Sequence, residues 1–225
     1  MKGIIYTLTD LQHILYLFMI FGVIASSISG AIRAIESKMD ITGAILLAFI
    51  NSNAGGTIRD LILHTDVFWT KSPIYIWLTI SIGIISFVAV YFNRHLINNK
   101  ILNMILFITD AMGLAAFSLA GVQASLNLQQ SYLIAILMGV WTSIGGGVIA
   151  DIVANRVPYV FSGELYITIA FIASLLYVLA VTQFNLDYML ASIIIALFTI
   201  AFRLISVKFR LRFPTIKSHE YLNEK

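Results

Sequence analysis

Residues 54–60 read AGGTIRD, and residues 145–151, which lie 91 positions further along the chain, read GGGVIAD. Each stretch falls within a long apolar run and places an aspartate four residues after its last glycine. Glycines weaken a helix, and a carboxylate inside hydrocarbon is costly unless it faces protein or a water-filled path. Two such stretches in the two halves of one chain predict a membrane transport protein with an internal repeat.

The composition supports this assignment. Of 225 residues, 60% are hydrophobic and 11% are charged, and the mean hydropathy is +0.93. Soluble domains carry about 25% charged residues. Seven apolar runs approach the roughly 20 residues that a helix needs to cross a bilayer. They cover 14–32, 41–63, 73–92, 101–125, 132–154, 165–181 and 188–205. The sequence lacks β-barrel alternation, so the expected fold is an all-α membrane protein with seven transmembrane helices.

The two halves of the chain align at a constant offset. Residues 22–76 match residues 113–167 without gaps, with 14 identities in 55 positions, and the shared glycines, serines and aspartates are the informative ones. Each copy holds three spans, an odd number, so the copies cross the membrane in opposite directions as inverted repeats. We expect one transmembrane domain (1–225), with repeats at about 14–92 and 101–181, an unpaired seventh helix at 188–205 and a basic tail at 206–225.

Basic residues are distributed unevenly between the two sets of loops. With the N-terminus outside, 11 of the 14 lysines and arginines fall on the inner side, Lys2 and Lys71 fall on the outer side, and Arg59 lies within a span. The positive-inside rule therefore places the C-terminus in the cytoplasm. The basic run at 208–212 is better explained as a lipid-headgroup anchor than as a nucleic-acid site.

The glycines predict kinks or breaks in the second and fifth helices. A break creates helix ends at bilayer depth, where carbonyl and hydroxyl oxygens could replace part of a cation's hydration shell. The expected pore and ion-binding residues flank these breaks: Ser52, Gly55, Gly56, Thr57, Asp60, Thr142, Ser143, Gly145, Gly146, Gly147 and Asp151.

The charged residues near the breaks leave alternatives open. Asp60 and Asp151 lie toward opposite membrane faces, where each could concentrate cations or could cap or brace a neighbouring helix. Arg59 does not face Asp60 on a regular helix, so Asp110 and Asp151 are its candidate partners, unless it reaches the outer interface. Asp110 is a third acidic candidate, either pore-lining or a helix-start cap.

These features resemble a known family. The stretches 22–30, 54–63, 110–121 and 145–151, with the helix count, resemble the trimeric intracellular cation (TRIC) channels over about residues 14–205, and most closely their prokaryotic members with a repeated glycine-motif domain. The resemblance implies a homotrimer with one pore per protomer, potassium as the chief permeant ion, and a prokaryotic plasma (inner) membrane location. Ala54 and Ala150 depart from the family pattern, which commonly has glycine and arginine there.

The leading hypothesis is a potassium channel gated near the second and fifth helices, with potassium or sodium as permeant ions and no cofactor. The second is a secondary transporter of a small solute such as glycine, because inverted repeats also serve carriers. A structural protein without transport would leave the buried aspartates unexplained. The sequence holds no cysteine, metal-ligand spacing, nucleophile–base pair or phosphate loop, so an enzyme is not expected.

Overall fold

The structure is a computed structural model that describes residues 2–96, 99–161 and 165–213; the distal part of the expected basic tail lies outside these residues. Six of its helices are long and apolar enough to cross a membrane, and α7 is a shorter apolar helix. The seven-helix all-α fold is therefore confirmed. The helices are α1 (Lys2–Glu36), α2 (Ile41–Ile62), α3 (Phe68–Lys71), α4 (Ile74–Phe92), α5 (Lys100–Asn127), α6 (Tyr132–Val153), α7 (Tyr166–Thr182) and α8 (Tyr188–Lys208), with 3-10 turns η1 (Arg94–Leu96) and η2 (Tyr159–Phe161).

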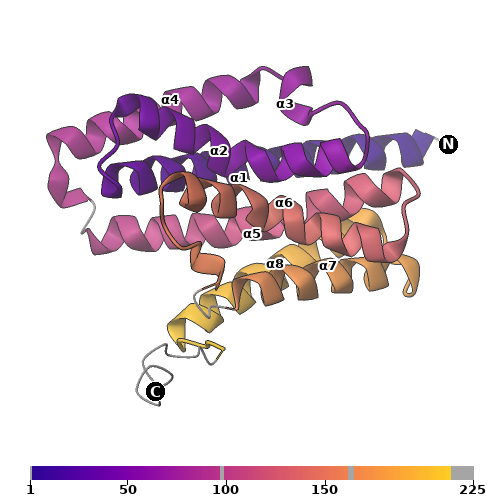
Figure 1. Ribbon diagram of the computed structural model, residues 1–225. Coiled ribbons are helices and arrows are strands. Elements are labelled where there is room, and N and C mark those ends of the chain that lie inside the picture. The colour runs from indigo at the N-terminus through magenta and orange to yellow at the C-terminus, as the bar shows by residue number, and fades with distance from the viewer. Residues whose placement is uncertain (1, 97–98, 162–164, 214–225) are drawn as a thin grey trace, which may run out of the picture.

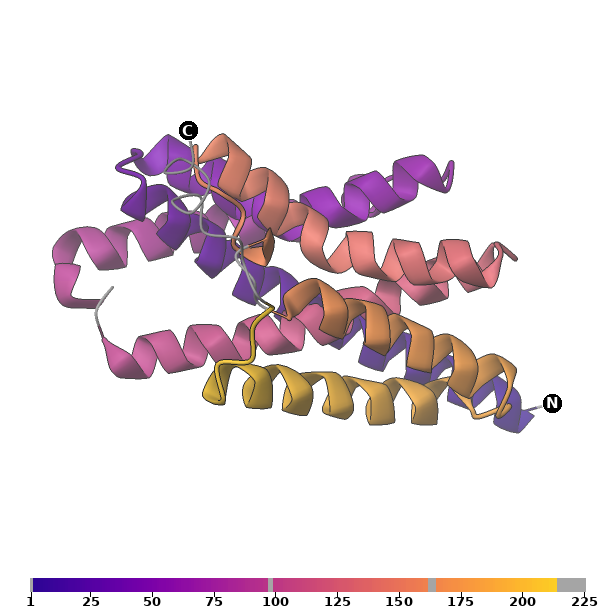
Figure 2. The ribbon, with the colours of Figure 1, turned by 60° about the horizontal axis from the view of Figure 1, so that its bottom comes forward.

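The long helices lie roughly along one common direction, and the start of α1 and the end of α8 lie at opposite ends of the bundle (Figure 1). We call these the N-terminal end and the C-terminal end. Helices α1, α2, α5 and α6 pack around one another in the centre. Helix α4 packs on α1 and α2, whereas α7 packs on α5 and α6. Helix α8 lies against α5 and α7, far from α4 (Figure 2).

The internal repeat is visible in the helix boundaries. Helices α2 and α6 begin and end 91 residues apart, and α1 and α5 end 91 residues apart. Left-handed backbone after these helices repeats as well, at Lys38 and Gln129 and at His64 and Asn155. The contacts of α4 with α1 and α2 recur as those of α7 with α5 and α6. The chain thus contains two three-helix units, and α8 is the added seventh helix.

Buried polar groups attach α8 to the second repeat. Gln123 of α5 donates to the hydroxyl oxygens of Tyr177 on α7 and Ser192 on α8, the latter at 3.1 Å. All three side chains are buried. Hydrogen bonds inside an apolar bundle fix the rotation of a helix because an unpaired partner would be costly. Among the described residues, no helix packs on α1 and α4 of the first repeat in the way that α8 packs on α5 and α7 of the second.

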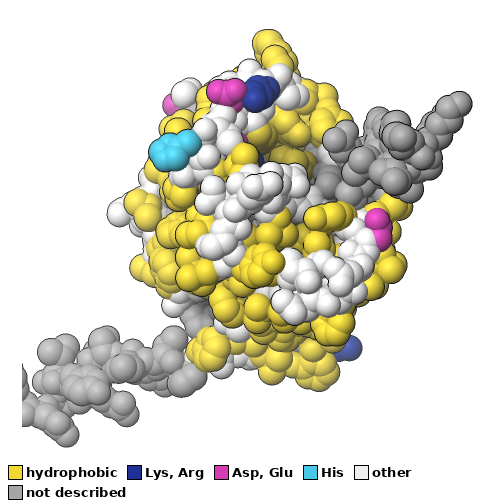
Figure 3. Space-filling model, turned by 90° about the vertical axis from the view of Figure 1, so that its right-hand side faces the viewer, with side chains coloured by type: hydrophobic (Ala, Val, Ile, Leu, Met, Phe, Trp, Pro, Cys, Tyr) yellow, Lys and Arg dark blue, Asp and Glu magenta, His cyan; other side chains and the backbone are white. Residues whose placement is uncertain are grey.

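The surface at the N-terminal end is mostly apolar or uncharged where it is described, with scattered charged side chains (Figure 3). Arg33, Lys38, Arg94, Arg156 and Lys208 instead lie near helix ends that meet at the C-terminal end. This uneven distribution of basic residues is the feature on which the positive-inside prediction rests. The side of the membrane that each end faces stays a prediction.

The expected unwound segments are not found, which corrects the prediction of helix breaks. Helix α2 continues through Gly55 and Gly56, and helix α6 continues through Gly145, Gly146 and Gly147. Helix α6 bends along its length without losing its helical turns (Figure 2). The carbonyls of these turns therefore remain within helices, and the glycines serve another purpose.

Candidate functional site

The glycines bring the backbones of α2 and α6 into direct contact. A Cβ atom added at Gly55 would lie 2.3 Å from the Thr142 carbonyl oxygen, and one at Gly146 would lie 2.2 Å from the Asn51 carbonyl oxygen. Position 146 is the repeat equivalent of 55, and position 142 is the repeat equivalent of 51, so the internal repeat relates these two contacts to each other. The pseudo-two-fold axis therefore passes through this crossing. Small residues allow such close helix packing inside lipid.

Further glycines repeat the same pattern outside the crossing. A Cβ at Gly30 would lie 2.3 Å from the Leu47 carbonyl oxygen, and one at Gly121 would lie 2.3 Å from the Met138 carbonyl oxygen. Both pairs are related by the offset of 91. The small-residue faces of α1 and α5 are thus packing surfaces for α2 and α6.

Asp60 braces the segment that follows α2. Its Oδ2 accepts the Phe68 backbone N–H at 2.8 Å, and its Oδ1 lies 2.7 Å from Arg59 Nε and 2.6 Å from Arg59 Nη2. Both side chains are buried. Arg59 therefore pairs with its neighbour Asp60, and the prediction that its partner is Asp110 or Asp151 is wrong. The arginine side chain is long enough to fold back along the helix, a geometry that face-to-face reasoning on a helix overlooks.

Asp151 braces the equivalent segment after α6. Its Oδ2 accepts the backbone N–H of Tyr159 at 3.2 Å, and Tyr159 is the repeat equivalent of Phe68. Its positive partner comes from another helix, because Arg33 Nε of α1 lies 3.6 Å from Asp151 Oδ1. Position 150 is alanine, so the second repeat replaces a neighbouring arginine with a distant one. The two carboxylates have the same bracing geometry and different charge partners.

Arg33 joins three of the central helices. Its Nη1 donates to Asn51 Oδ1 at 3.0 Å on α2 and to the Gly147 carbonyl at 3.3 Å on α6. Its guanidinium lies 5.2 Å from the centre of the Tyr159 ring. Burial raises the pKa of the Tyr159 phenol, which therefore stays neutral. By sequence alone, Arg33 is placed only among the basic residues of the inner side, although it continues the α1 face of Ser26, Ser29 and Gly30 at helical spacing.

A polar hollow lies at the C-terminal end between α1, α5 and α6, and we call it the C-end hollow. It has a volume of about 320 Å³ and leads to a deeper space of about 20 Å³ that shares Arg33, Asp110 and Tyr159 with it. Its main part is lined by Ser29, Ile32, Arg33, Glu36, Phe107, Asp110, Asp151, Arg156, Val157 and Tyr159. Its three carboxylates each lie within 4.0 Å of a guanidinium: Asp151 of Arg33, Glu36 of Arg156, and Asp110 of Arg203, which stands just outside the lining.

Asp110 belongs to this hollow and is not a helix-start cap. Helix α5 begins at Lys100, more than two turns earlier. Asp110 Oδ1 accepts the Tyr166 hydroxyl at 3.3 Å, and Arg203 Nη2 of α8 lies 3.8 Å from Asp110 Oδ2. The carboxylate thus links α5, α7 and α8 at the wall of the C-end hollow.

A second hollow, the N-end hollow, has a volume of about 440 Å³ and lies against Tyr16, Arg59, Phe68, Tyr75 and Gln123. Seven of the ten residues that line the main C-end hollow have their repeat equivalents in the lining of the N-end hollow. The two hollows are therefore the same feature of the two repeats, opening to opposite ends. Their chemistry differs, since Met19, Ala124 and Asn127 stand in the N-end hollow where the C-end hollow has Asp110, Arg33 and Glu36.

An apolar cluster lies between the two hollows along α1, since Gly22 and Val23 fall between Met19 of the N-end hollow and Ser26 of the deeper space. The Phe117 ring of α5 is buried and packs over Gly22 of α1, where an added Cβ would lie 3.1 Å from it. Phe117 belongs to a cluster with Val23 and Tyr75. On the other side of this cluster, Asn51 Nδ2 donates to the Ser26 carbonyl at 2.6 Å, and both residues line the deeper space.

The remaining expected site residues fall into two groups. Ser143, Gly147, Asp110 and Asp151 line the C-end hollow or its deeper space, and Arg59 lines the N-end hollow. The others lie at helix contacts. Ser52 and Thr142 are buried and donate to carbonyls four residues earlier, and Thr57 accepts from Trp69 Nε1 at 2.8 Å. A Cβ at Gly56 would meet the Phe68 ring, and Gly145 faces Gly55.

Comparison with known proteins adds the family context. A family model described as Glycine transporter matches residues 16–91 and again residues 107–182. The UPF0126 inner membrane protein YadS of Escherichia coli (strain K12) is 32% identical over 208 residues, which cover 92% of this chain and 98% of that protein. A UPF0126 membrane protein of Vibrio cholerae is 35% identical over 204 residues, or 90% of this chain and 82% of the relative.

Solved structures give the same fold. The TRIC trimeric intracellular cation channel orthologue from Rhodobacter sphaeroides superimposes with a TM-score of 0.77 at 29% identity, covering 88% of this chain and 99% of the other. A prokaryotic TRIC channel in 0.5 M KCl superimposes with a TM-score of 0.78 at 30% identity, covering 90% and 100%. Trimeric intracellular cation channels from C. elegans, at 18% identity, share the fold.

Proposed function

Because this chain belongs to the Glycine transporter family and is a prokaryotic member of the TRIC channel family, we propose that it is a potassium-conducting cation channel with one pore per protomer. The pore runs from the N-end hollow to the C-end hollow between α1, α2, α5 and α6. The relatives are channels and membrane proteins, which agrees with the expectation that the chain is not an enzyme.

The observation that carries the proposal is the presence of both hollows in one conformation. A carrier that works by alternating access opens its central site to one side at a time, whereas a channel keeps both mouths and closes a short constriction. Here the two mouths are repeat equivalents, and the Phe117 cluster lies between them. We assign this arrangement to a closed channel.

The C-end hollow has three carboxylates in its lining, whereas the lining of the N-end hollow has none. Each of these carboxylates is paired with a guanidinium, so movement of a guanidinium away from its partner would expose negative charge to cations at that end. In the deeper space, Ser143 and the Gly147 carbonyl are the candidate groups for replacing water around a passing ion. In this structure Arg33 donates a hydrogen bond to the Gly147 carbonyl and pairs with Asp151, so the passage of an ion requires the guanidinium to move. Gating thus involves the Arg33 side chain leaving its partners on α6.

At the other mouth, positive charges are offset by nearby carboxylates. Arg59 and Lys71 line the N-end hollow, and they pair with Asp60 and Asp66 respectively. Asp60 would therefore act mainly by neutralising Arg59 and holding Phe68, while Asp151 and Asp110 act on the ion directly.

The assembly and location follow the relatives. We propose a homotrimer, since the structures with this fold are described as trimeric channels, and an inner-membrane location, since YadS is described as an inner membrane protein. Apolar side chains exposed on α2 and α6, such as Leu46, Leu133 and Trp141, then face lipid or a neighbouring protomer.

Potassium flux into liposomes tests the proposal. Purified wild-type protein should dissipate a potassium gradient faster than empty liposomes. Asp151→Asn should slow this flux, because the Arg33 guanidinium, once without its counter-charge, repels potassium in the hollow. Asp40→Asn is the matched control, because Asp40 caps α2 from an exposed position and asparagine caps equally well. Equal flux from the wild type and the Asp151→Asn variant would refute the assigned role, and saturable glycine uptake without potassium flux would favour the carrier.

A further inference from the structure

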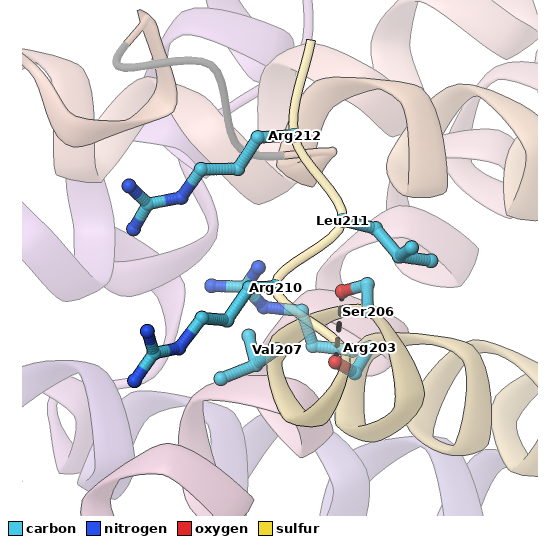
Figure 4. A pocket seen from close by; sticks show the side chains of 6 residues that line it. All are labelled: Arg203, Ser206, Val207, Arg210, Leu211 and Arg212. Atoms are coloured by element: carbon cyan, nitrogen blue, oxygen red, sulfur yellow. Dashed lines mark hydrogen bonds between the residues drawn. The ribbon is translucent and has the colours of Figure 1, made fainter.

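A basic pocket lies at the end of α8, outside both hollows. It has a volume of about 170 Å³ and is lined by Arg203, Ser206, Val207, Arg210, Leu211 and Arg212. Three of these six residues are arginines and none is acidic. Figure 4 shows the three arginine side chains extending to one side of the turn, with Leu211 on the other.

The pocket is built by the way α8 ends. The backbone N–H of Phe209 donates to the Ile205 carbonyl and that of Leu211 donates to the Ser206 carbonyl, at 2.9 and 2.8 Å. Arg210 takes a left-handed conformation with φ of 51°, a position that favours glycine. This turn folds the chain back beside α8, so that Arg210 and Arg212 stand next to the buried Arg203.

Guanidinium groups are suited to phosphate. The planar fork of arginine donates two parallel hydrogen bonds to neighbouring phosphate oxygens, which lysine cannot do. Arg203 is already held in place, because its guanidinium stacks 4.7 Å from the centre of the Tyr166 ring and lies near Asp110. A fixed arginine beside two exposed ones forms a partly preorganised anion site.

The surroundings of the pocket indicate where the phosphate comes from. The pocket stands at the last turn of an apolar spanning helix, and Val207, Phe209, Leu211 and Phe213 expose large apolar side chains around it. Basic and aromatic residues together at the end of a span mark the level of the lipid headgroups. A soluble anion would not need this apolar rim.

We propose that this pocket binds the phosphate of an anionic glycerophospholipid in the leaflet at the C-terminal end. The lipid tails lie along the apolar residues at the end of α8, and the phosphate is held by Arg203, Arg210 and Arg212. Because Arg203 also contacts Asp110, the lipid and the wall of the C-end hollow share one guanidinium.

Native mass spectrometry of the full chain in detergent tests this site with three probes: phosphatidylglycerol, phosphatidylethanolamine and inorganic phosphate. In detergent no charged membrane surface contributes, so binding of single lipids reports direct contacts. The wild type should bind phosphatidylglycerol more tightly than phosphatidylethanolamine. The double variant Arg210→Gln/Arg212→Gln should bind phosphatidylglycerol about tenfold more weakly, or worse, because two charge-assisted contacts are lost.

The matched control is Lys38→Gln/Arg94→Gln, which removes the same charge from exposed positions at the same end but away from the pocket. It should bind phosphatidylglycerol as the wild type does. Equal weakening in both double variants, or equal affinity of the wild type for the two lipids, would overturn the proposal. Inorganic phosphate binding that the arginine variant loses, without phosphatidylglycerol binding, would assign the pocket to a soluble anion instead. Unchanged thermal unfolding of the arginine variant would exclude misfolding as the cause.

Discussion

Replacement of Gly146 by alanine should separate the two central helices. The added Cβ would lie 2.2 Å from the Asn51 carbonyl oxygen, whereas ordinary contact begins near 3.4 Å. The difference, 3.4 − 2.2, means that α2 and α6 must move apart by about 1 Å at their crossing. Both contacting atoms belong to helix backbones or are fixed to them, so no side-chain rotation can relieve the clash.

The expected cost follows from overpacking. Extra atoms in a well-packed interior destabilise a protein by about 1–3 kcal/mol, although alanine regains about 1 kcal/mol of helix propensity over glycine. In a chain of this size, 1 kcal/mol corresponds to roughly 2–4 °C in the melting temperature. The net loss is then up to about 2 kcal/mol, so Gly146→Ala should lower the melting temperature in detergent by up to about 8 °C, measured by tryptophan fluorescence.

Gly113→Ala is the control for this experiment. Its Cβ would find the nearest atom 3.7 Å away, so it should gain helix propensity without a clash and leave the melting temperature unchanged or slightly higher. If Gly146→Ala proves as stable as Gly113→Ala, the glycines are not there for close packing, and a hinge role would return as the better explanation.

Two more substitutions test the charge pair and the constriction. Asp60→Asn should destabilise the protein by about 3 kcal/mol, because it leaves Arg59 buried without its counter-charge. The control Asp66→Asn removes only an exposed pair and should change the melting temperature little. Equal melting temperatures of the two variants would contradict the stabilising role of the Arg59–Asp60 pair. Phe117→Ala should raise resting potassium flux in liposomes by opening the path between the hollows, with the exposed Phe92→Ala as control; flux no higher than wild type would remove Phe117 from the constriction.

The fold was largely predictable because the apolar runs and the internal repeat recur regularly along the sequence, and because glycines and aspartates are energetically unfavourable inside apolar helices. Seven apolar runs of spanning length and an odd number of spans per copy led directly to inverted repeats. The offset of 91 then proved accurate at the level of helix boundaries and turn residues. Shared Gly, Ser and Asp identities carried this information, since such residues persist inside apolar helices for a physical reason.

The use of the glycines was not predictable from their number. Whether a glycine breaks a helix or admits a neighbour depends on which way it faces, and Gly55 faces the Thr142 carbonyl across the crossing. The packing of α2 against α6 offsets the lost helix propensity. Arg33 was missed for a related reason, because its partners Asn51, Gly147 and Asp151 come from two other helices. Only the three-dimensional arrangement brings such groups together.

Recording from purified protein in planar bilayers under a KCl gradient tests the central claim most directly. The proposed pore predicts discrete unitary currents that reverse near the potassium equilibrium potential and occur more often in Phe117→Ala. Folded protein that gives no unitary currents, while liposomes show saturable, gradient-coupled uptake of glycine, would contradict the channel and identify the two hollows as the alternate faces of a carrier.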